Sequence, residues 1–418
     1  MQKLYHIKAN DIFHNLRNLP QLVFEVTDAC NLRCKYCGYG NIYEGYDKRE
    51  NLNFSLYRAK TIIDYLHSLW KKKHCVDVTQ VMSIGFYGGE PLLNIILIKD
   101  IIQYIESLSF VGKKFIYSMT TNGILLDEHM DYLVQKQFRL LISLDGDKEA
   151  QSYRVNANNQ NSFEKVFNNV NLLRNKHSEY FNKFVRFNSV LHNKNSVGSI
   201  YYFIKNTFGK IPSITPLNSS GIKPEMIEEF NKTYRNYNES IKEAANCEAL
   251  RADLFIDNPE TRKILNYLYY NTDTVFGGFN DLLKQKTKGI NIPTGTCIPF
   301  SKKMFITVKG RILQCERINH EFALGWVTDE GVKLDFEAIA KQHNDYVFRY
   351  AKQCEKCGNR TACMQCVYQI DDIHDPNTRC RGFCTEAQKE KQNEQCLRYL
   401  SEHPELYKRL LNEVVIRG

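Results

Sequence analysis

The amino-acid sequence predicts an α/β fold with a parallel sheet, followed by a second module that is rich in cysteine. Over residues 21–208, short β-branched runs alternate with longer segments of helical period. A strand followed by a helix, repeated, builds a parallel sheet through right-handed crossovers. Cysteines return in density from Cys297 onward, which marks the second module. A length of 418 residues agrees with this division, since it exceeds one ordinary domain and fits a core of about 200 residues with an added module.

Five runs are strand candidates, at residues 22–26, 81–87, 115–119, 140–144 and 184–190. Two of the segments between them have one apolar face at helical spacing. The first face follows an N-cap at Ser55 and consists of Ala59, Ile62, Ile63, Leu66 and Leu69. The second face consists of Leu97, Ile101, Ile105 and Leu108.

Four unusual motifs follow the first four strand candidates. A cysteine cluster follows the first, GGEP (88–91) the second, TTNG (120–123) the third and SLDG (143–146) the fourth. In parallel α/β sheets the ligand binds at the carboxyl ends of the strands, where loops converge and helix N-termini point inward. We therefore expect these four motifs to form one site.

The rest of the chain predicts the domain limits. We expect an N-terminal segment at 1–20, a core at 21–208, a connector of helices at 209–296, a cysteine-rich domain at 297–385 and a C-terminal helix at 386–418. The connector is rich in Pro, Ser and Asn at its start and has helical patterns at 225–245 and 261–270. The helical run at the end of the chain covers 386–415.

Composition excludes several classes of protein. No apolar run of about 18 residues appears, and the N-terminus lacks the features of a signal peptide, so we expect no membrane association and a cytoplasmic protein. The net charge of +9 is scattered in short runs rather than gathered in a basic stripe, which argues against nucleic acid as a partner. Fourteen cysteines in a reducing compartment argue for metal binding or catalysis more than for disulfides.

The first cysteine cluster offers three thiols and lacks a fourth ligand. Cys30, Cys34 and Cys37 lie within eight residues in CNLRCKYC, and no His or Cys follows in the next turn. A structural zinc site needs four ligands. A 4Fe-4S cubane held by three thiolates leaves one iron without a protein ligand. That iron can bind a small molecule, so the lack of a fourth protein ligand would itself serve the function.

This CX3CX2C motif, with Tyr36 before its third cysteine, resembles the signature of radical S-adenosylmethionine (radical SAM) enzymes. The resemblance implies a partial (β/α)6 TIM-like barrel. It also implies a cluster whose open iron binds the methionine part of S-adenosyl-L-methionine. Reductive cleavage would then produce a 5'-deoxyadenosyl radical that removes a hydrogen atom from the substrate.

The resemblance assigns the other motifs to the same nucleotide. Gly88, Gly89 and Glu90 would hold the methionine amine, and Thr121 and Asn122 would face the ribose. Ser143, Asp145 and Arg154 would hold the carboxylate end, Arg154 by a charge-assisted pair. Asn188 would reach the ribose or adenine. The plainer alternatives are a common turn at Asn122-Gly123 and a solvated surface position for Arg154.

The C-terminal cysteines resemble the SPASM domain of radical SAM enzymes that modify peptides and proteins. Cys297 and Cys315 flank a predicted hairpin with its turn at Lys309-Gly310. A CX2CX5CX2C run follows, with two residues in its last gap where the family has three. The run and the closing candidates are Cys354, Cys357, Cys363, Cys366, Cys380 and Cys384.

By the family's interleaved ligation, this domain would hold two auxiliary [4Fe-4S] clusters, so the chain would hold three clusters in all. One auxiliary cluster would take Cys297, Cys315 and Cys366. The other would take Cys354, Cys357 and Cys363, with Cys380 or Cys384 as its fourth ligand. A pair of structural zinc sites is the alternative for this module. The cysteines outside every pattern are expected to pack in the interior; they are Cys75, Cys247 and Cys396.

Glu316 directly follows Cys315. In related enzymes that oxidise a sulfatase residue, an Asp in this position accepts a proton, and Glu would do the same. The alternative is a surface carboxylate paired with Arg317 or Arg311.

The resemblance favours a radical SAM maturase that oxidatively modifies a ribosomally synthesised precursor peptide, through a thioether or a carbon-carbon crosslink. An external one-electron reductant would supply the electron, and a separate protein would serve for leader binding if the leader is recognised. The first alternative is an anaerobic sulfatase-maturing enzyme that forms formylglycine. That group usually has a further cysteine soon after the first one of the SPASM run, and none lies between Cys297 and Cys315. The second alternative is a non-catalytic metal-binding interaction protein.

Overall fold

The computed structural model describes residues 4–71, 80–110, 112–255, 261, 264–265, 268, 292–360, 363–375 and 377–413. The chain divides into two compact units. The first, which we call the sheet unit, holds residues 20–254 and 303–333. The second, the cysteine-rich unit, holds residues 1–19, 255–302 and 334–418. The predicted domain limits stay predictions, because functional domains need not coincide with compact units.

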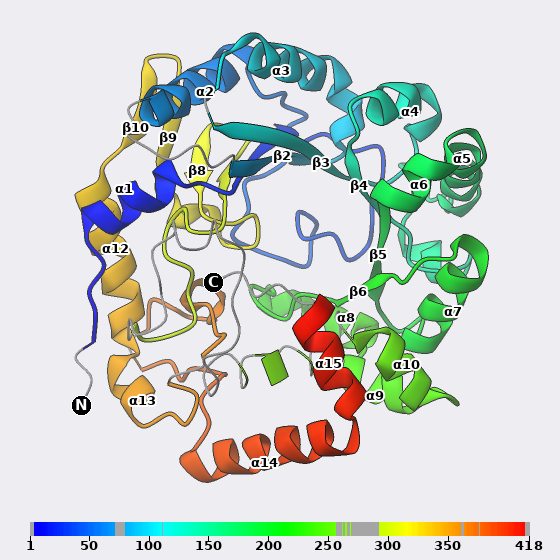
Figure 1. Ribbon diagram of the computed structural model, residues 1–418, viewed down its shortest axis with the longest axis vertical. Helices are drawn as coiled ribbons and strands as arrows, with labels where there is room; N and C mark the ends of the chain where they lie inside the picture. The colour runs from blue at the N-terminus through cyan, green and yellow to red at the C-terminus, as the bar shows by residue number, and fades with distance from the viewer. Residues whose placement is uncertain are drawn as a thin grey trace. The chain divides into compact units, whose positions relative to one another are not determined.

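A ten-stranded mixed sheet forms the centre of the sheet unit (Figure 1), in the order β10-β9-β8-β7-β1-β2-β3-β4-β5-β6. Strands β1 to β6 run parallel and in chain order. They are Gln21–Thr27, Gln80–Gly88, Lys113–Thr121, Arg139–Ser143, Val185–Leu191 and Ser213–Pro216. All five strand candidates are therefore confirmed.

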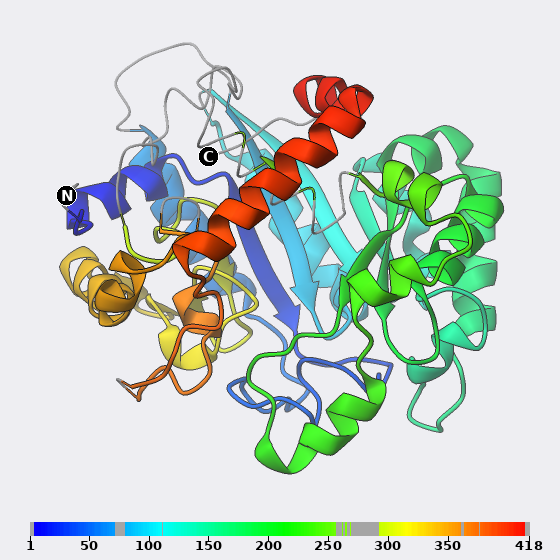
Figure 2. The same cartoon turned by 90° about the horizontal axis from the view of Figure 1, so that it is seen from below.

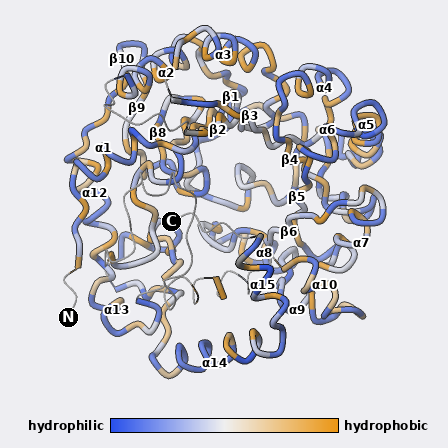
Figure 3. Tube along the Cα trace, in the orientation of Figure 1, coloured by the Kyte–Doolittle hydropathy of each residue, from blue (hydrophilic) through white to orange (hydrophobic). Residues whose placement is uncertain are grey.

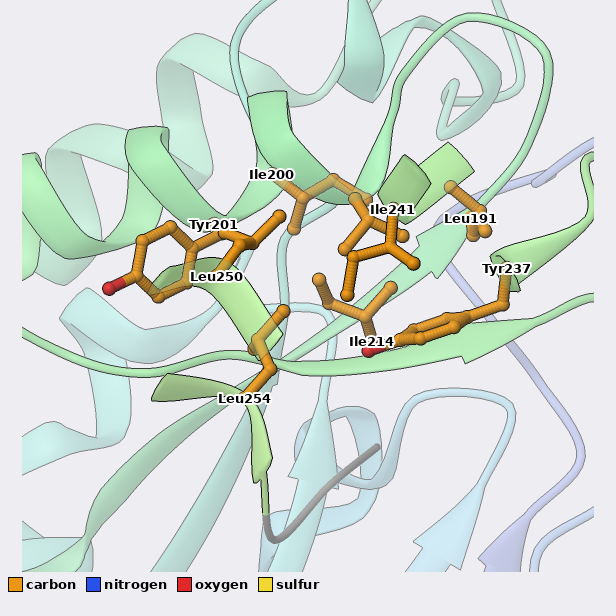
Figure 4. Close-up of a cluster of buried hydrophobic side chains, with 9 residues drawn as sticks. Leu191, Ile200, Tyr201, Ile214, Tyr237, Ile241, Leu250 and Leu254 are labelled. Carbon is orange, nitrogen blue, oxygen red and sulfur yellow. The ribbon is translucent and has the colours of Figure 1, made fainter. Parts of the chain in front are cut away.

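β6 corrects one prediction, because it lies where we expected only helices. It has four residues and ends at Pro216, and such a short run beside proline and serine is typical of a loop. Pairing with β5 makes it a strand, with Asn188 opposite Ser213 and Val190 opposite Thr215. Its Ile214 packs into a core shared by α7 (Val197–Phe208), α9 (Tyr237–Lys242) and α10 (Cys247–Asp253) (Figure 4).

Six helices follow the strands and cover the outer face of the parallel part of the sheet (Figure 1). They are α2 (Leu56–Lys71), α3 (Ile95–Ser107), α4 (Leu126–Gln135), α5 (Phe163–Lys176), α6 (Ser178–Phe184) and α7 (Val197–Phe208). Apolar and polar residues alternate along these helices (Figure 3), as expected when one face packs on a sheet. α2 starts after the predicted cap, since the Ser55 hydroxyl accepts a hydrogen bond from the Arg58 N–H at 3.5 Å. Leu108 lies just beyond the end of α3.

The predicted hairpin is confirmed and extends the sheet past β1. β7 (Met304–Ile306) runs parallel to β1, and β8 (Arg311–Leu313) returns antiparallel to β7. The turn at Lys309-Gly310 closes with Gly310 at φ +89°, a conformation that glycine adopts without strain. β9 (Gly325–Thr328) and β10 (Gly331–Leu334) complete this edge.

Three short helices follow β6 in the sheet unit: α8 (Ile227–Thr233), α9 (Tyr237–Lys242) and α10 (Cys247–Asp253). They agree with the helical pattern predicted at 225–245. Most of the pattern predicted at 261–270 lies outside the described residues.

In the cysteine-rich unit, α1 (Ala9–Arg17) packs against α12 (Phe336–Arg349), with the Phe13 and Phe336 ring centroids 5.6 Å apart. α13 (Ala351–Glu355) follows. The predicted final helix is two helices, α14 (Glu386–Glu402) and α15 (Pro404–Glu413). Pro404 explains the break, because proline lacks the N–H that would continue α14 and suits the first position of a new helix. Among the described residues, no helix has the length and apolar composition that crossing a membrane requires.

Candidate functional site

The loop after β1 carries the first three cysteines and lies beyond the arrowheads of the strands (Figure 2). Asp28 ties this loop together, because its carboxylate accepts hydrogen bonds from the N–H groups of Leu52 at 2.6 Å and Glu50 at 3.0 Å. The chain therefore returns to the end of β1 before α2 begins, and the cysteines stay at the carboxyl end of the sheet.

The thiols of Cys30, Cys34 and Cys37 are free and partly buried. The Leu32 N–H donates to Cys30 Sγ at 3.4 Å, and the Arg49 guanidinium donates to Cys37 Sγ at 3.6 Å. Burial, and then the neighbouring thiols, raise the pKa of Cys34 to about 12. Buried thiols of this kind become thiolates when a metal supplies positive charge. The donor set therefore fits a metal cluster.

Among the residues that the structure describes, no three His, Cys, Asp or Glu side chains lie close enough to hold a single metal ion. Thiolates that bind different irons of a cubane do not converge on one ion.

Gly88 and Gly89 bring the loop after β2 against the loop after β1. The backbone is bonded there, with the Gly89 N–H donating to the Thr27 carbonyl at 2.9 Å. A Cβ on Gly88 would lie 2.1 Å from the Thr27 oxygen, and one on Gly89 would lie 2.0 Å from the Ala29 oxygen. Only glycine allows so close an approach, and it seats the cysteine loop on the GGE motif.

Glu90 joins two of the predicted motifs, with 1% of its surface exposed. Its carboxylate accepts hydrogen bonds from the Thr121 hydroxyl at 2.8 Å, the Asn122 N–H at 2.7 Å and the Leu92 N–H at 3.1 Å. Burial raises its pKa to about 7 although these donors favour the carboxylate. A carboxylate accepts about four hydrogen bonds. One acceptor position thus remains for the predicted contact with an amine.

Asn122 also contacts the cysteine loop. Its amide nitrogen donates to Asn31 Oδ1 at 2.7 Å and lies 3.9 Å from Cys30 Sγ. Its Oδ1 accepts a hydrogen bond from the Ile124 N–H at 3.0 Å, so the turn at Asn122-Gly123 does form. The turn and the site are therefore one structure and do not compete as explanations.

Asp145 and Arg154 form a buried bidentate ion pair, with N–O distances of 2.9 and 3.0 Å. Asp145 is 0% exposed and Arg154 is 7% exposed, so a solvated surface position for Arg154 is wrong. Tyr36, from the cysteine motif, donates its hydroxyl hydrogen to Asp145. Burial alone would raise the pKa of Asp145, but Arg154, with hydrogen bonds from His192 and Tyr36, lowers it to about 2.

Ser143 and Asn188 lie on neighbouring strands, directly opposite each other in the β4–β5 register. We call the edge of the sheet where these two residues and the four motifs lie the rim. Asn188 Oδ1 accepts a hydrogen bond from the Thr215 hydroxyl of β6 at 3.0 Å. The motifs after β1 to β4 thus lie at one edge of the sheet, as predicted, and Asn188, in the middle of β5, lies opposite the last residue of β4. The ligand roles of their side chains stay predictions.

Sequence reasoning missed Arg49 and His192. Arg49 donates to Cys37 and stacks on the Tyr39 ring at 4.6 Å. His192 is fully buried, with Nε2 3.8 Å from Asp145 Oδ2. Neither belongs to a motif, and only the fold brings them to the site.

Cys315 and Glu316 follow β8 and belong to the sheet unit. Glu316 pairs with Lys303 at 2.9 Å, whereas Arg311 pairs with Asp47 at 3.2 Å. Burial would raise the pKa of Glu316, but Lys303 holds it below its ordinary value. The carboxylate is thus partly buried and paired with a partner that the sequence did not indicate.

The other SPASM-type cysteines belong to the cysteine-rich unit and form two groups. One group holds thiols that lie close enough to influence one another electrostatically, namely Cys354, Cys357, Cys363 and Cys380. Cys384 joins it through a hydrogen bond with the Cys357 thiol. The second group is Cys297 and Cys366, and burial, followed by the influence of Cys297, raises the pKa of Cys366 to about 11.

Cysteines outside these groups were expected to pack in the interior. Cys247 and Cys396 are instead only partly buried. Cys396 packs beside a core that includes Phe255, Leu406 and Leu410. Cys75 lies outside the described residues.

Residues 24–197 match the family model of the Radical SAM superfamily. A cysteine-type anaerobic sulfatase-maturating enzyme of Clostridium novyi is 24% identical over 382 residues, covering 88% of this chain and 93% of the relative. A radical SAM cyclopropyl synthase of Paramaledivibacter caminithermalis is 25% identical over 170 residues, covering 40% of this chain and 34% of the relative. The solved structure of anSMEcpe with bound AdoMet has 16% sequence identity and a TM-score of 0.56, covering 94% of this chain and 100% of that chain. At this identity, the likeness to anSMEcpe shows a shared fold.

Proposed function

We propose that this chain is a radical SAM enzyme that oxidatively modifies a ribosomally synthesised precursor peptide, because residues 24–197 match the Radical SAM superfamily, as the cysteine motif and its companions predicted. The product would carry a thioether or a carbon-carbon crosslink. The observation that best supports the proposal is the hydrogen-bonded assembly of the rim, in which Glu90 fastens the TTNG loop and Asn122 contacts the cysteine loop. This assembly places the three thiols of the cysteine loop beside polar groups at the carboxyl ends of the parallel strands.

The residues present fit S-adenosyl-L-methionine and its cluster. Cys30, Cys34 and Cys37 would hold a [4Fe-4S] cluster, at which reductive cleavage of the bound nucleotide supplies a radical that abstracts hydrogen. The nucleotide would be bound by the rim residues Gly88, Gly89, Glu90, Thr121, Asn122, Ser143, Asp145, Arg154 and Asn188. Arg154 is already paired with Asp145, so it would bind the carboxylate end with the N–H groups that Asp145 leaves over.

Two auxiliary clusters are part of the proposal, within a SPASM domain that follows a partial barrel in the chain. Cys354, Cys357, Cys363 and Cys380 would hold one of them. Their electrostatic proximity favours Cys380 as the fourth ligand, since Cys380 influences the thiols of both Cys354 and Cys363, whereas Cys384 is hydrogen-bonded to Cys357. The other cluster would take Cys297, Cys366 and Cys315.

Glu316 is our candidate proton acceptor. Lys303 keeps its carboxylate ionised at neutral pH, and an ionised carboxylate is able to take a proton from the substrate. An external one-electron reductant and a separate leader-binding protein are the proposed partners, and the cytoplasm is the proposed setting.

Formylglycine formation on a sulfatase is the second candidate. Its support is the similarity to sulfatase-maturating enzymes over 88% of this chain. The absence of a cysteine between Cys297 and Cys315 favours precursor-peptide modification instead.

Anaerobic reconstitution followed by mass spectrometry would decide the function. We expect iron and sulfide in the purified chain, and release of methionine and 5'-deoxyadenosine after reduction. Incubation with short peptides encoded beside the gene should remove two hydrogens per crosslink. A cysteine-containing sulfatase peptide would instead exchange sulfur for oxygen and lose two hydrogens. Absence of 5'-deoxyadenosine would contradict both candidates and favour a non-catalytic protein.

A further inference from the structure

The inner face of strands β1 to β5 surrounds a cavity of about 610 Å³ in the sheet unit. Much of its lining follows the two-residue period of one sheet face, as Gln21 and Val23 show in β1 and Arg139 and Leu141 in β4. Tyr87 also lines the cavity. Because Tyr87 directly precedes the GGE motif, the cavity reaches from the starts of the strands to the candidate site.

The cavity carries an excess of positive charge. Among the described residues, four cations line it, Arg139, Lys183, Arg186 and Lys303, with Glu316 as its one carboxylate. Glu316 is already paired with Lys303. Within the part of the chain that the structure describes, the guanidinium groups of Arg139 and Arg186 have no ion-pair partner.

The two arginines lie close together on neighbouring strands. Arg139 opens β4, and Arg186 lies opposite Leu141, two residues further along that strand. Strand spacing and rise place their Cα atoms on the order of 8 Å apart. Lys210 lies near this pair, since burial and then the positive charge of Arg186 lower its pKa. Both arginines are exposed, and their like charges repel each other unless an anion lies between them.

We propose that Arg139 and Arg186 bind an acidic side chain of the substrate peptide, while another residue of the same peptide reaches the rim. This inference rests on the proposed function and names its substrate class. The paired guanidinium groups suit a carboxylate, which accepts hydrogen bonds at both oxygens. From Arg139 to Ser143, the strand rises about 13 Å, which an extended peptide spans in about four residues. The modified residue therefore lies about four positions from an Asp or Glu.

Binding of defined peptides to the reconstituted holoenzyme tests this proposal. The probes are fluorescein-labelled nonapeptides with a central Glu or Gln between alanines. We expect roughly tenfold tighter binding of the Glu peptide. The R139Q/R186Q double variant should reduce that preference to less than twofold. The matched control is K165Q/K176Q, which removes the same charge from exposed ion pairs on α5 and should keep the preference.

Each outcome of this experiment decides the proposal. Equal binding of the two peptides, no saturable binding of the Glu peptide, or a preference that survives in R139Q/R186Q would overturn it. If wild type releases 5'-deoxyadenosine but shows no preference for Glu, this inference fails and the proposed function stands. If the preference is present but no 5'-deoxyadenosine forms, the proposed function fails and the carboxylate site stands.

Discussion

At the scale of single residues, the buried pair of Asp145 and Arg154 links several parts of the site. Asp145 receives hydrogen bonds from Arg154, Tyr36 and the Val190 N–H, and thereby joins the cysteine loop to β5. A carboxylate with this many donors is costly to replace, because each donor would lose its partner inside the protein.

Asp145→Asn is expected to lower the free energy of unfolding by about 3 to 5 kcal/mol, since it leaves the Arg154 charge buried without a counterion. Denaturant titration of the iron-loaded protein measures this. The control is Asp131→Asn, whose carboxylate pairs with Lys176 and His177 at the exposed surface and should change stability little. Equal effects of the two substitutions would show that the buried ion pair contributes no more to the free energy of unfolding than the exposed one.

Glu25 provides a test of pH dependence. Burial raises its pKa from an ordinary value of 4.5 to about 7, although the Val308 N–H donates to it. The folded protein therefore holds this proton more tightly than the unfolded chain does. The stability that Glu25 contributes is full below about pH 4.5 and is lost as the pH rises through 7.

Glu25→Gln cannot titrate, so the variant should gain stability relative to wild type as the pH rises across that range. We expect a relative change of roughly 3 kcal/mol, measured by denaturant unfolding at several pH values. Glu90 titrates in both proteins and cancels from the difference. Parallel pH profiles of wild type and variant would contradict the assignment.

Motif residues were predictable one by one, whereas their partners were not. The sequence indicated Glu90 and Asp145 because each belongs to a short motif after a strand, and the family resemblance indicated Arg154. It did not indicate Arg49 or Lys303, because their contacts with Cys37 and Glu316 depend on how distant segments fold together.

At the scale of elements, the hairpin that carries Cys315 depends on one glycine. Gly310 has φ +89°, and a Cβ there would lie 2.4 Å from the Val327 carbonyl oxygen. Gly209, which ends α7, also has a positive φ of +67°, but a Cβ there would have no neighbouring atom within 4 Å. Substitution of Gly209 therefore tests backbone strain alone, whereas substitution of Gly310 tests backbone strain together with steric overlap.

Gly209→Ala is expected to cost about 1 kcal/mol from strain alone. Gly310→Ala should cost about 3 kcal/mol or more, because the strand that pairs with it must move. Denaturant unfolding gives both values, and iron content reports whether Cys315 still reaches its place. Equal losses of unfolding free energy in the two variants would mean that the steric overlap at Gly310 adds nothing to the backbone strain.

Elements with strong periodicity were predicted well, and short ones were not. The five longer parallel strands and the helices α2 and α3 follow clear apolar patterns, so local sequence determines them. β6 has only four residues, and its strand geometry comes from pairing with β5. The break between α14 and α15 was readable from Pro404, but the regular pattern around it concealed the boundary.

At the scale of the whole molecule, the segment that holds most of the SPASM-type cysteines has little regular structure. Between α13 and α14 the described residues form one short 3-10 helix, Val367–Gln369, among turns. Few apolar side chains are buried there, so bound metal would supply much of its stability.

Iron removal by an anaerobic chelator should therefore raise amide hydrogen exchange in residues 354–384 far more than in β1 to β5. Hydrogen exchange with mass spectrometry measures this segment by segment. Uniform loss of protection would indicate that the metal stabilises the whole chain, and unchanged exchange would contradict metal binding by this segment.

The parallel pairing of β7 with β1 has a practical consequence for anyone who shortens the protein. The region that matches the superfamily ends at residue 197, yet the neighbour of β1 on one side arrives only at residue 304. A fragment that ends before residue 304 would leave the backbone N–H and C=O groups on that side of β1 unpaired. Because β1 is largely apolar, such an exposed strand edge would promote aggregation. The region that matches the superfamily is therefore completed by a strand that comes more than 100 residues later in the chain.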